Sequence, residues 1–261
     1  MNISFNIYGF IIGIAIVIAS SLIENQLKNQ KILNDNFQKI GIISFIFSIF
    51  GARLWHGFTD FHLYKNNLLS FFEIWNGGLS IFGGIFGGIL GLILSFYFIN
   101  DLKKLSKQQK QQKIISLLDY SIFGLPIGQA IGRWGNYFNQ ELYGRPANGY
   151  FKIFIEPEFR VQGFENFEYF HPLFFYEMVA TSLFALFLYA AKYKKINFVS
   201  NIGSGKIFLI YLIYYSVVRL LLDFLRIDTA FLFFNLIGIN QLVLMATIFV
   251  STYLLTRKTK L

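Results

Sequence analysis

Residues 7–23 read IYGFIIGIAIVIASSLI and contain no charged side chain. A helix needs roughly 17–25 apolar residues to cross the hydrocarbon core of a bilayer, so this stretch predicts a membrane-spanning helix. The first 27 residues hold no Lys or Arg, and no small-residue cleavage site follows Ile18, unlike in a removable signal peptide. We therefore expect this span to stay in the mature protein.

Further apolar stretches follow the first one along the chain. The seven candidate spans cover residues 7–23, 40–58, 77–99, 114–132, 171–191, 206–225 and 236–256. The fourth is the weakest, because Asp119, Pro126 and Gln129 interrupt it. The pattern predicts an all-α integral membrane protein with seven transmembrane helices, in which residues 1–261 form a single transmembrane domain. Residues 146–170 are expected to form a small extracytoplasmic head or loop segment.

The composition points to the same class of protein. Charged residues make up only 14% of the 261 positions, whereas an ordinary soluble domain has roughly 25%. The absence of cysteine excludes a disulfide scaffold, a thiolate nucleophile and a cysteine metal site. Three histidines without H-E-x-x-H spacing argue against a zinc enzyme. We therefore expect neither a metal nor a cofactor.

The distribution of basic residues predicts how the chain is oriented. Of the 23 basic residues, 15 lie in the segments between spans 1 and 2, 3 and 4, and 5 and 6, and after span 7. The positive-inside rule places these segments in the cytoplasm, so the N-terminus is outside and the C-terminus inside. A net charge of +9 would also suit nucleic acid. The lysines lie at membrane edges, which instead indicates that they orient the chain in the bilayer and contact its anionic lipids. We expect no nucleic-acid partner.

The other eight basic residues all fall in the outer half under this topology, and six of them are arginine. They are Arg53, Lys65, Arg133, Arg145, Lys152, Arg160, Arg219 and Arg226. Arginine makes planar, bidentate contacts with phosphate, and lysine does not. The outer half is therefore expected to hold an anion.

The densest polar cluster follows the fourth span, where residues 132–145 read GRWGNYFNQELYGR. Two Arg, two Asn and a Glu stand there among three Gly and several large aromatic residues. Polar groups at membrane depth are expensive, which favours a functional site over a bland exit loop.

Glycines and a histidine mark the starts of two other spans. Gly77 and Gly78 come where the third span starts, and backbone there is able to approach a ligand closely. From Gly84 onward, small-xxx-small spacing is more typical of close helix packing. His171 opens the fifth span and, taken alone, is more typical of an interfacial polar residue than of a catalyst.

The end of the sixth span carries three charged residues on one helix face. Arg219, Asp223 and Arg226 are separated by four and three residues. Arg219 and Asp223 form an internal ion pair, bind a substrate, or do both, since ionisable residues within a span are functional by default.

These blocks together resemble the prolipoprotein diacylglyceryl transferase family. The strongest match is residues 132–144, G-R-W-G-N-Y-F-N-Q-E-L-Y-G, which is similar to the family signature. Supporting blocks are residues 8–9, 51–53, 75–84, 171–177 and 219–226, so the resemblance covers most of the chain.

The resemblance implies a reaction, its substrates and a location. The enzyme would transfer the diacylglyceryl group of phosphatidylglycerol to the thiol of the lipobox cysteine in the signal peptide of a prolipoprotein. A thioether forms and glycerol phosphate leaves, which is the first step of lipoprotein maturation. The substrate supplies the nucleophile, and we expect no cofactor. The location would be the bacterial cell membrane (plasma or inner), multi-pass, with the active site toward the outer leaflet.

The resemblance and the charge pattern together predict the site residues. The expected catalytic residues are Arg133, Arg219, Glu141, Asn136 and Tyr8. The expected substrate-binding residues are Arg133, Asn136, Gly144, Arg53, Arg219, Arg226, Asp223, Gly77, Gly78 and His171. The two arginines Arg133 and Arg219 are expected to hold the phosphate and the charge of the leaving group.

Three positions depart from the family pattern. Phe82 stands where the family often has a histidine proposed as the base, and Asp223 stands where a glutamate is usual. Residues 173–174 are Leu-Phe in place of a polar pair. With Phe82 unable to take a proton, Glu141, Asp223, His56 or a water molecule are the candidates for the proton acceptor.

Two other functions fit parts of the pattern. A transporter or channel for an anionic solute would also use internal arginines and glycine-rich spans. It predicts polar residues along a path to both faces, whereas here they crowd one side, and no inverted repeat is evident. The second alternative is a structural membrane anchor without catalytic activity, but that function would not explain the polar cluster at residues 133–145.

Overall fold

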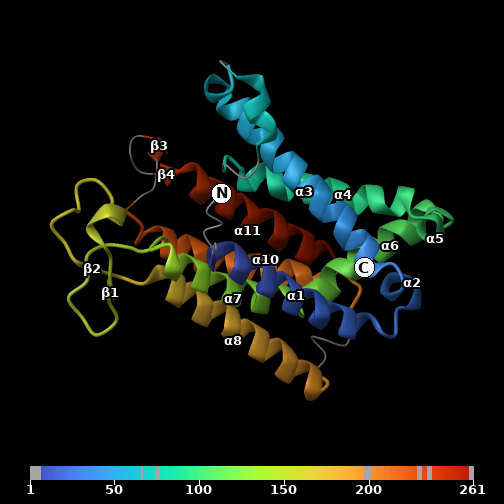
Figure 1. The fold of residues 1–261 in the computed structure, drawn as a ribbon. Coiled ribbons are helices and arrows are strands. Elements are labelled where there is room, and N and C mark those ends of the chain that lie inside the picture. Colours follow the sequence, from blue (N-terminus) through green and yellow to red (C-terminus); the bar gives the residue numbers. More distant parts are fainter. Residues whose placement is uncertain are drawn as a thin grey trace. The chain divides into compact units, whose positions relative to one another are not determined.

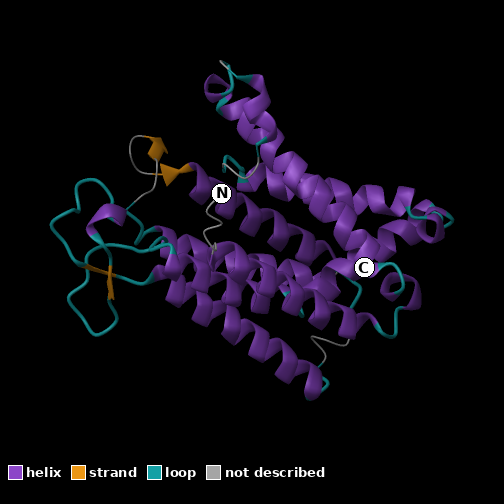
Figure 2. Cartoon of the chain, viewed as in Figure 1, coloured by secondary structure: helices purple, strands orange, loops and turns teal. Residues whose placement is uncertain are grey.

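A computed structural model describes residues 7–65, 67–73, 77–196, 202–227, 231–233 and 237–258 (Figure 1). Helices dominate the described chain, and strands occur only as short pieces (Figure 2). The chain divides into two compact units. One is Leu27–Leu117, and the other joins Met1–Gln26 to Leu118–Leu261. Each unit is described by itself.

Several helices are of the membrane-spanning kind by length and composition. Three qualify alone: α1 (Ile7–Leu27), α3 (Phe37–Thr59) and α8 (Leu173–Tyr193). A fourth candidate is the pair α6 (Lys107–Ser121) and α7 (Leu125–Phe138), which passes the same test only when the two are joined. A mostly helical protein with membrane-type helices is therefore confirmed, and the count of seven spans stays a prediction.

The fourth predicted span is bent where the sequence is weakest. Residues 122–124 form a turn between α6 and α7, and the two helices meet at 51°. Pro126 lies in the first turn of α7. Proline lacks an N–H and has a fixed φ, so it suits a first helical turn and not a helix interior. The proline therefore begins a new helix.

Asp119, the first of the three residues that interrupt that span, connects α6 to the start of α10 (Lys206–Asp223). Its carboxylate is fully buried. It accepts hydrogen bonds from the backbone N–H groups of Gly203 at 2.8 Å, Gly205 at 2.7 Å and Phe208 at 3.0 Å. The first N–H groups of a helix have no partner within the helix. Asp119 supplies a partner for the Phe208 N–H of α10 and for the N–H groups of two glycines just before the helix, and a negative charge there is favoured by the helix dipole.

In the unit Leu27–Leu117, α3 and α4 (Ile81–Phe98) pack closely through glycine. Added Cβ atoms on Gly83 and Gly87 would collide with the backbone of α3, at Gly51 and Phe47 respectively. Gly84 and Gly88 have only ordinary contacts, at 3.4 Å or more. The small-residue packing that the sequence indicates is confirmed, and it runs along one face of α4. The same unit contains α2 (Lys31–Asn34), α5 (Asn100–Lys103), η1 (Phe61–Leu63) and η2 (Leu68–Phe72).

The third predicted span starts later as a helix than its sequence suggests. Gly77 and Gly78 have φ values of 86° and 71°, and α4 begins at Ile81. Positive φ is compatible with glycine and not with a right-handed helix. The two glycines therefore form the segment that leads into the helix.

In the other unit, α7, α8, α10 and α11 (Ile239–Lys258) pack together, and α1 lies along α7 (Figure 1). Its apolar core joins the turn at residues 122–123 to α8 and α10. At one end, β1 (Ile153–Phe154) pairs antiparallel with β2 (Tyr169–Phe170), next to η4 (Pro157–Phe159). A second pair joins β3 (Phe231–Phe233) to β4 (Ile237–Gly238). The predicted head segment thus contains a minimal two-stranded sheet.

Candidate active site

A buried carboxylate on α8 is the centre of a polar network. Glu177 is fully buried in the second turn of α8. Its Oε1 accepts hydrogen bonds from Arg133 Nη2 at 2.6 Å and from the Tyr215 hydroxyl at 2.8 Å. Its Oε2 accepts one from Arg219 Nη1 at 2.8 Å. Side chains from α7, α8 and α10 therefore meet on one carboxylate, which is the pairing that a buried charge requires.

Arg133 is also held by its own helix. Its Nη1 donates to Asn136 Oδ1 at 2.9 Å, and Asn136 Nδ2 donates to Glu141 Oε1 at 2.8 Å. The spacing of three residues puts Arg133 and Asn136 on one face of α7. Asn136 is buried and Glu141 is exposed. The network therefore runs from the surface at Glu141 inward to Glu177, and it joins four of the predicted catalytic residues.

The buried part of this network carries surplus positive charge. Two guanidinium groups, on Arg133 and Arg219, share the single carboxylate of Glu177. The arginine side chains keep 22% and 18% of their surface exposed, so a ligand is able to reach them. Each guanidinium has five N–H donors, and Arg133 Nε has no hydrogen-bond partner within the described chain. The site can bind an anion with several oxygen acceptors.

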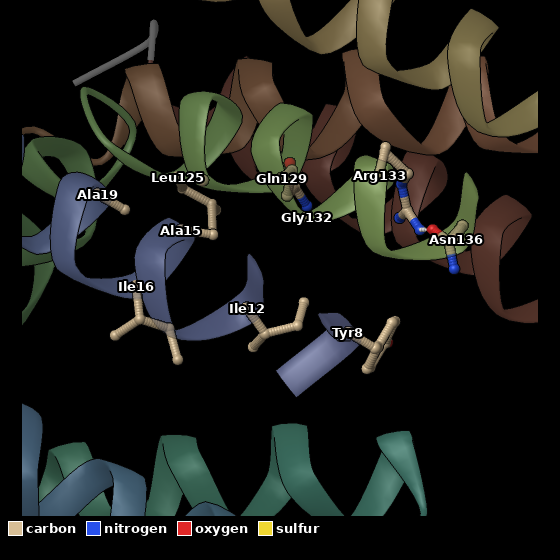
Figure 3. Close-up of a pocket in the computed structure, with 11 residues that line it drawn as sticks. Tyr8, Ile12, Ala15, Ile16, Ala19, Leu125, Gln129, Gly132, Arg133 and Asn136 are labelled. Carbon is tan, nitrogen blue, oxygen red and sulfur yellow. Dashed lines mark hydrogen bonds between the residues drawn. The ribbon is translucent and has the colours of Figure 1, made fainter. Parts of the chain in front are cut away.

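A pocket of about 290 Å³ between α1 and α7 leads to this network (Figure 3). Arg133 and Asn136 line one end of it from α7, and Tyr8 lines it from α1. The Tyr8 ring lies against Gly135, where an added Cβ would be 2.7 Å from the ring. Gly135 therefore makes room for the fifth predicted catalytic residue beside the arginine.

The loop after α7 has a strained backbone around Glu141. Gln140 and Leu142 have φ values of 51° and 58°, a region that side chains other than glycine rarely adopt. The Glu141 N–H donates to the Asn136 carbonyl at 2.9 Å, and Gln140 Oε1 accepts from the N–H of Glu156 in the head at 2.6 Å. Such strain persists only where surrounding contacts hold it, and it is common at functional sites.

Gly144 and His171 lie where this loop meets the ends of α8 and α10. The Gly144 N–H donates to the His171 carbonyl at 2.9 Å, and an added Cβ on Gly144 would be 2.8 Å from the Leu225 carbonyl oxygen. His171 Nδ1 is 3.1 Å from the Tyr176 hydroxyl. Both predicted residues therefore hold the loop against the helix ends through their backbones.

The acid at the end of α10 pairs differently from the expectation. Arg219 binds Glu177, and Asp223 faces Arg226 Nη1 at 3.9 Å. The Arg219–Asp223 ion pair suggested by the four-residue spacing is therefore not among the described ion pairs. Asp223 is buried, and neither of its carboxylate oxygens has a hydrogen-bond partner in the described part of the chain.

The predicted residues of the unit Leu27–Leu117 form a cluster around Arg53. This arginine is 5% exposed, and its Nε donates to the Phe71 carbonyl at 2.5 Å. Its Nη1 donates to the carbonyls of Gly77 at 2.6 Å and Gly78 at 2.9 Å, and its Nη2 donates to that of Ser70 at 2.6 Å. Arg53 therefore fixes the segment that leads into α4. Its predicted contact with substrate stays a prediction.

One proton-acceptor candidate, His56, also belongs to the unit Leu27–Leu117. His56 Nδ1 is 2.8 Å from the Tyr64 hydroxyl, and its Nε2 is 3.8 Å from Asp60. The side chain of Phe82 lies outside the described residues. In the part of the chain that the structure describes, no group of three or more His, Cys, Asp or Glu residues is placed to hold a metal ion.

Sequence reasoning missed Glu177, the residue that organises the site. It noted the block 171–177 but assigned no role to its last residue. A signal was present, because Glu177 is the one acidic residue in the otherwise apolar stretch 171–191. An ionisable residue at membrane depth is by default paired and functional. Tyr215, four residues before Arg219, carried no comparable signal.

Comparison with known proteins points to one family. A family model described as prolipoprotein diacylglyceryl transferase matches residues 1–257. A protein of Acaryochloris marina is 36% identical over 230 residues, which are 86% of this chain and 77% of that protein. A protein of Prochlorococcus marinus is 35% identical over 239 residues (85% and 74%), and one of Lactobacillus acidophilus is 28% identical over 250 residues (95% and 83%). All three are named phosphatidylglycerol–prolipoprotein diacylglyceryl transferase.

Proposed function

The chain belongs to the prolipoprotein diacylglyceryl transferase family, and from that premise we propose that it transfers the diacylglyceryl group of phosphatidylglycerol to the lipobox cysteine thiol of a prolipoprotein. One observation carries the proposal: two partly exposed arginines share one buried glutamate, and one of the two, Arg133, lines the end of a largely apolar pocket. Surplus positive charge next to an apolar surface suits a lipid with a phosphate head group.

Arg133 and Arg219 bind the phosphate of the lipid donor. Their guanidinium groups present planar N–H forks to phosphate oxygens, and Glu177 fixes both forks in place. The same groups stabilise the negative charge that grows on the leaving phosphate oxygen. Asn136 keeps Arg133 oriented from the other side.

The thiol sulfur attacks the glyceryl carbon that bears the phosphodiester. A carbon–sulfur bond forms, the carbon–oxygen bond breaks, and its electron pair stays on the phosphate oxygen of the departing glycerol phosphate. A thiol with a pKa of about 8.5 is mostly protonated at neutral pH, so its proton must be removed. Glu141 accepts that proton, because it is the exposed carboxylate that is hydrogen-bonded into the network. The nearby arginines favour the thiolate.

The site opens toward the outer leaflet, in a seven-span protein of the bacterial cell membrane with its N-terminus outside. The residues found at the two ends of the unit that contains the network support this orientation. Arg133, Arg219 and Glu177 lie at the same end of their helices, together with the head segment. Lys192 and Lys206 lie at the opposite ends of α8 and α10. The positive-inside rule puts the lysine end in the cytoplasm. Residues 1–261 act as one transferase domain, with residues 146–170 as its external head.

A reconstituted assay tests the proposal. Purified protein is mixed with phosphatidylglycerol and a lipobox peptide, and mass spectrometry follows the peptide. We expect a diacylglyceryl mass gain that is absent when the peptide cysteine is replaced by serine. Arg133→Ala should lower the rate at least about 100-fold, as loss of an oxyanion donor does.

Arg145→Ala is the matched control, because Arg145 is an exposed arginine twelve residues further along the same polar segment. It should leave the rate within about twofold, as surface substitutions away from special features usually do. Folded wild-type protein that gives no mass gain would overturn the proposed function.

A further inference from the structure

The pocket between α1 and α7 is a groove with one polar end. Ile12, Ala15, Ile16 and Ala19 line it from α1, and Leu125 and Gly128 line it from α7. The polar side chains at its other end are those of Tyr8, Arg133 and Asn136 (Figure 3). Gln129 of α7 also lines the groove, and its Oε1 accepts a hydrogen bond from the Tyr211 hydroxyl. The groove therefore joins an anion-binding end to a mostly apolar length of wall.

The length of the groove matches one lipid tail. Tyr8 and Ala19 are eleven residues apart on α1, which at 1.5 Å per residue is about 17 Å. A lipid tail reaches from its head group to the middle of the bilayer, and half of the hydrocarbon core is about 15 Å. With the phosphate on Arg133, one tail would extend along the groove toward Ala19 and Leu125.

Small residues line the far half of the groove, where α1 and α7 approach each other closely. Ala15 is 4% exposed, and an added Cβ on Gly128 would be 3.0 Å from the Cβ of Ala19. A side chain larger than alanine at Ala15 or Gly128 would fill the space between the helices. Ala15 is seven residues from Tyr8, or about 10 Å along the helix axis. A larger side chain there would shorten the groove and leave its polar end intact.

We infer that this groove seats one acyl chain of the phospholipid donor, and that Ala15 and Gly128 set the length of chain that fits. This inference rests on the proposed function and adds a specificity determinant to it. The occupant is an acyl chain because the groove leads from the arginine that binds phosphate and has the length of a single tail. A bulky residue at Ala15 should discriminate against long chains and spare short ones.

The test compares Ala15→Leu with the wild type on two phosphatidylglycerols, one dipalmitoyl and one dioctanoyl, in the reconstituted transfer assay. The extended octanoyl chain is too short to pass Ala15. We expect the ratio of kcat/KM for dipalmitoyl to dioctanoyl lipid to fall about tenfold or more, since each excluded methylene is worth a large factor in a fitted pocket. Turnover of the short lipid by Ala15→Leu also shows that the variant is folded.

Gly13→Leu is the matched control. An added Cβ on Gly13 has no atom within 4 Å, so this change enlarges α1 away from the groove. The ratio of kcat/KM for dipalmitoyl to dioctanoyl lipid should be the same in Gly13→Leu as in the wild type. An equal loss of both lipids in Ala15→Leu overturns the inference, as does an unchanged ratio. A raised KM for the peptide at an unchanged lipid ratio would mean that the groove holds the signal peptide. Wild type inactive on both lipids would instead contradict the proposed function.

Discussion

Glu177 is the residue on which the two arginines of the site depend. Its carboxylate has no exposed surface and makes ion pairs at 2.6 and 2.8 Å. Breaking a buried ion pair by removing one partner typically costs about 3–5 kcal/mol, because it leaves a buried charge uncompensated. Here two charges would be left, on Arg133 and Arg219.

We therefore expect Glu177→Gln to lower the free energy of unfolding by about 3 kcal/mol or more and to abolish transfer. The glutamine keeps the shape of the side chain, but its NH₂ group would face an arginine N–H donor. Thermal unfolding in detergent and the transfer assay measure the two effects. Glu168→Gln, an exposed glutamate of the head, is the control and should stay within about 0.5 kcal/mol of the wild type. A Glu177→Gln protein with wild-type melting and rate would contradict the role assigned to this residue.

For single residues, the sequence predicts which residues belong to the site better than it predicts which of them contact each other. Arg133, Asn136 and Glu141 are close in sequence and in one signature, and the structure joins them by hydrogen bonds. Arg219 is 42 residues from Glu177, and no local spacing predicts that contact. Whether the Arg219 side chain extends toward Asp223 on its own helix or toward Glu177 on α8 depends on how the helices pack, which the local sequence does not determine.

At the scale of elements, the α3–α4 pair shows how glycine controls the distance between two helices. An added Cβ on Gly87 would collide with the Phe47 carbonyl, whereas one on Gly88 would be 3.7 Å from Ser48. Gly87→Ala should therefore force the helices apart and destabilise the protein by about 1–3 kcal/mol. Gly88→Ala should be neutral or stabilising by about 0.5–1 kcal/mol, because alanine restricts the unfolded chain and favours a helix.

The difference between the two thermal unfolding midpoints measures this effect. The two glycines are neighbours in the same helix and receive the same substitution, so the variants differ only in what the added Cβ contacts. Equal midpoints for Gly87→Ala and Gly88→Ala would show that the close approach of α3 and α4 is absent in solution.

The positions of helices are easier to predict than the places where they bend. Apolar length locates α1, α3 and α8 to within a few residues. The turn at residues 122–124 follows from Pro126, but the role of Asp119 depends on α10, more than 80 residues later. A polar residue that interrupts an apolar stretch is visible in the sequence, whereas the helix end that it caps is visible only in the structure.

At the scale of the whole molecule, the absence of cysteine allows a direct test of membrane orientation. Tyr150→Cys introduces one thiol in the head, and Gln109→Cys introduces one in the lysine-rich start of α6, both at exposed positions. In intact spheroplasts, an impermeant maleimide should label Tyr150→Cys and not Gln109→Cys. After permeabilisation both should be labelled. Labelling of Gln109→Cys from outside would reverse the proposed orientation.

The separation of Arg133 from Glu177 also has a consequence in time. The two residues are 44 positions apart in the chain. At a synthesis rate of about 5–20 residues per second, the arginine leaves the ribosome about 2–9 seconds before its counter-charge. An ionisable side chain within a membrane segment is costly to insert unless it is paired. We expect the nascent α7 to wait near the insertion machinery until α8 arrives, so that the two enter the bilayer as a neutralised pair.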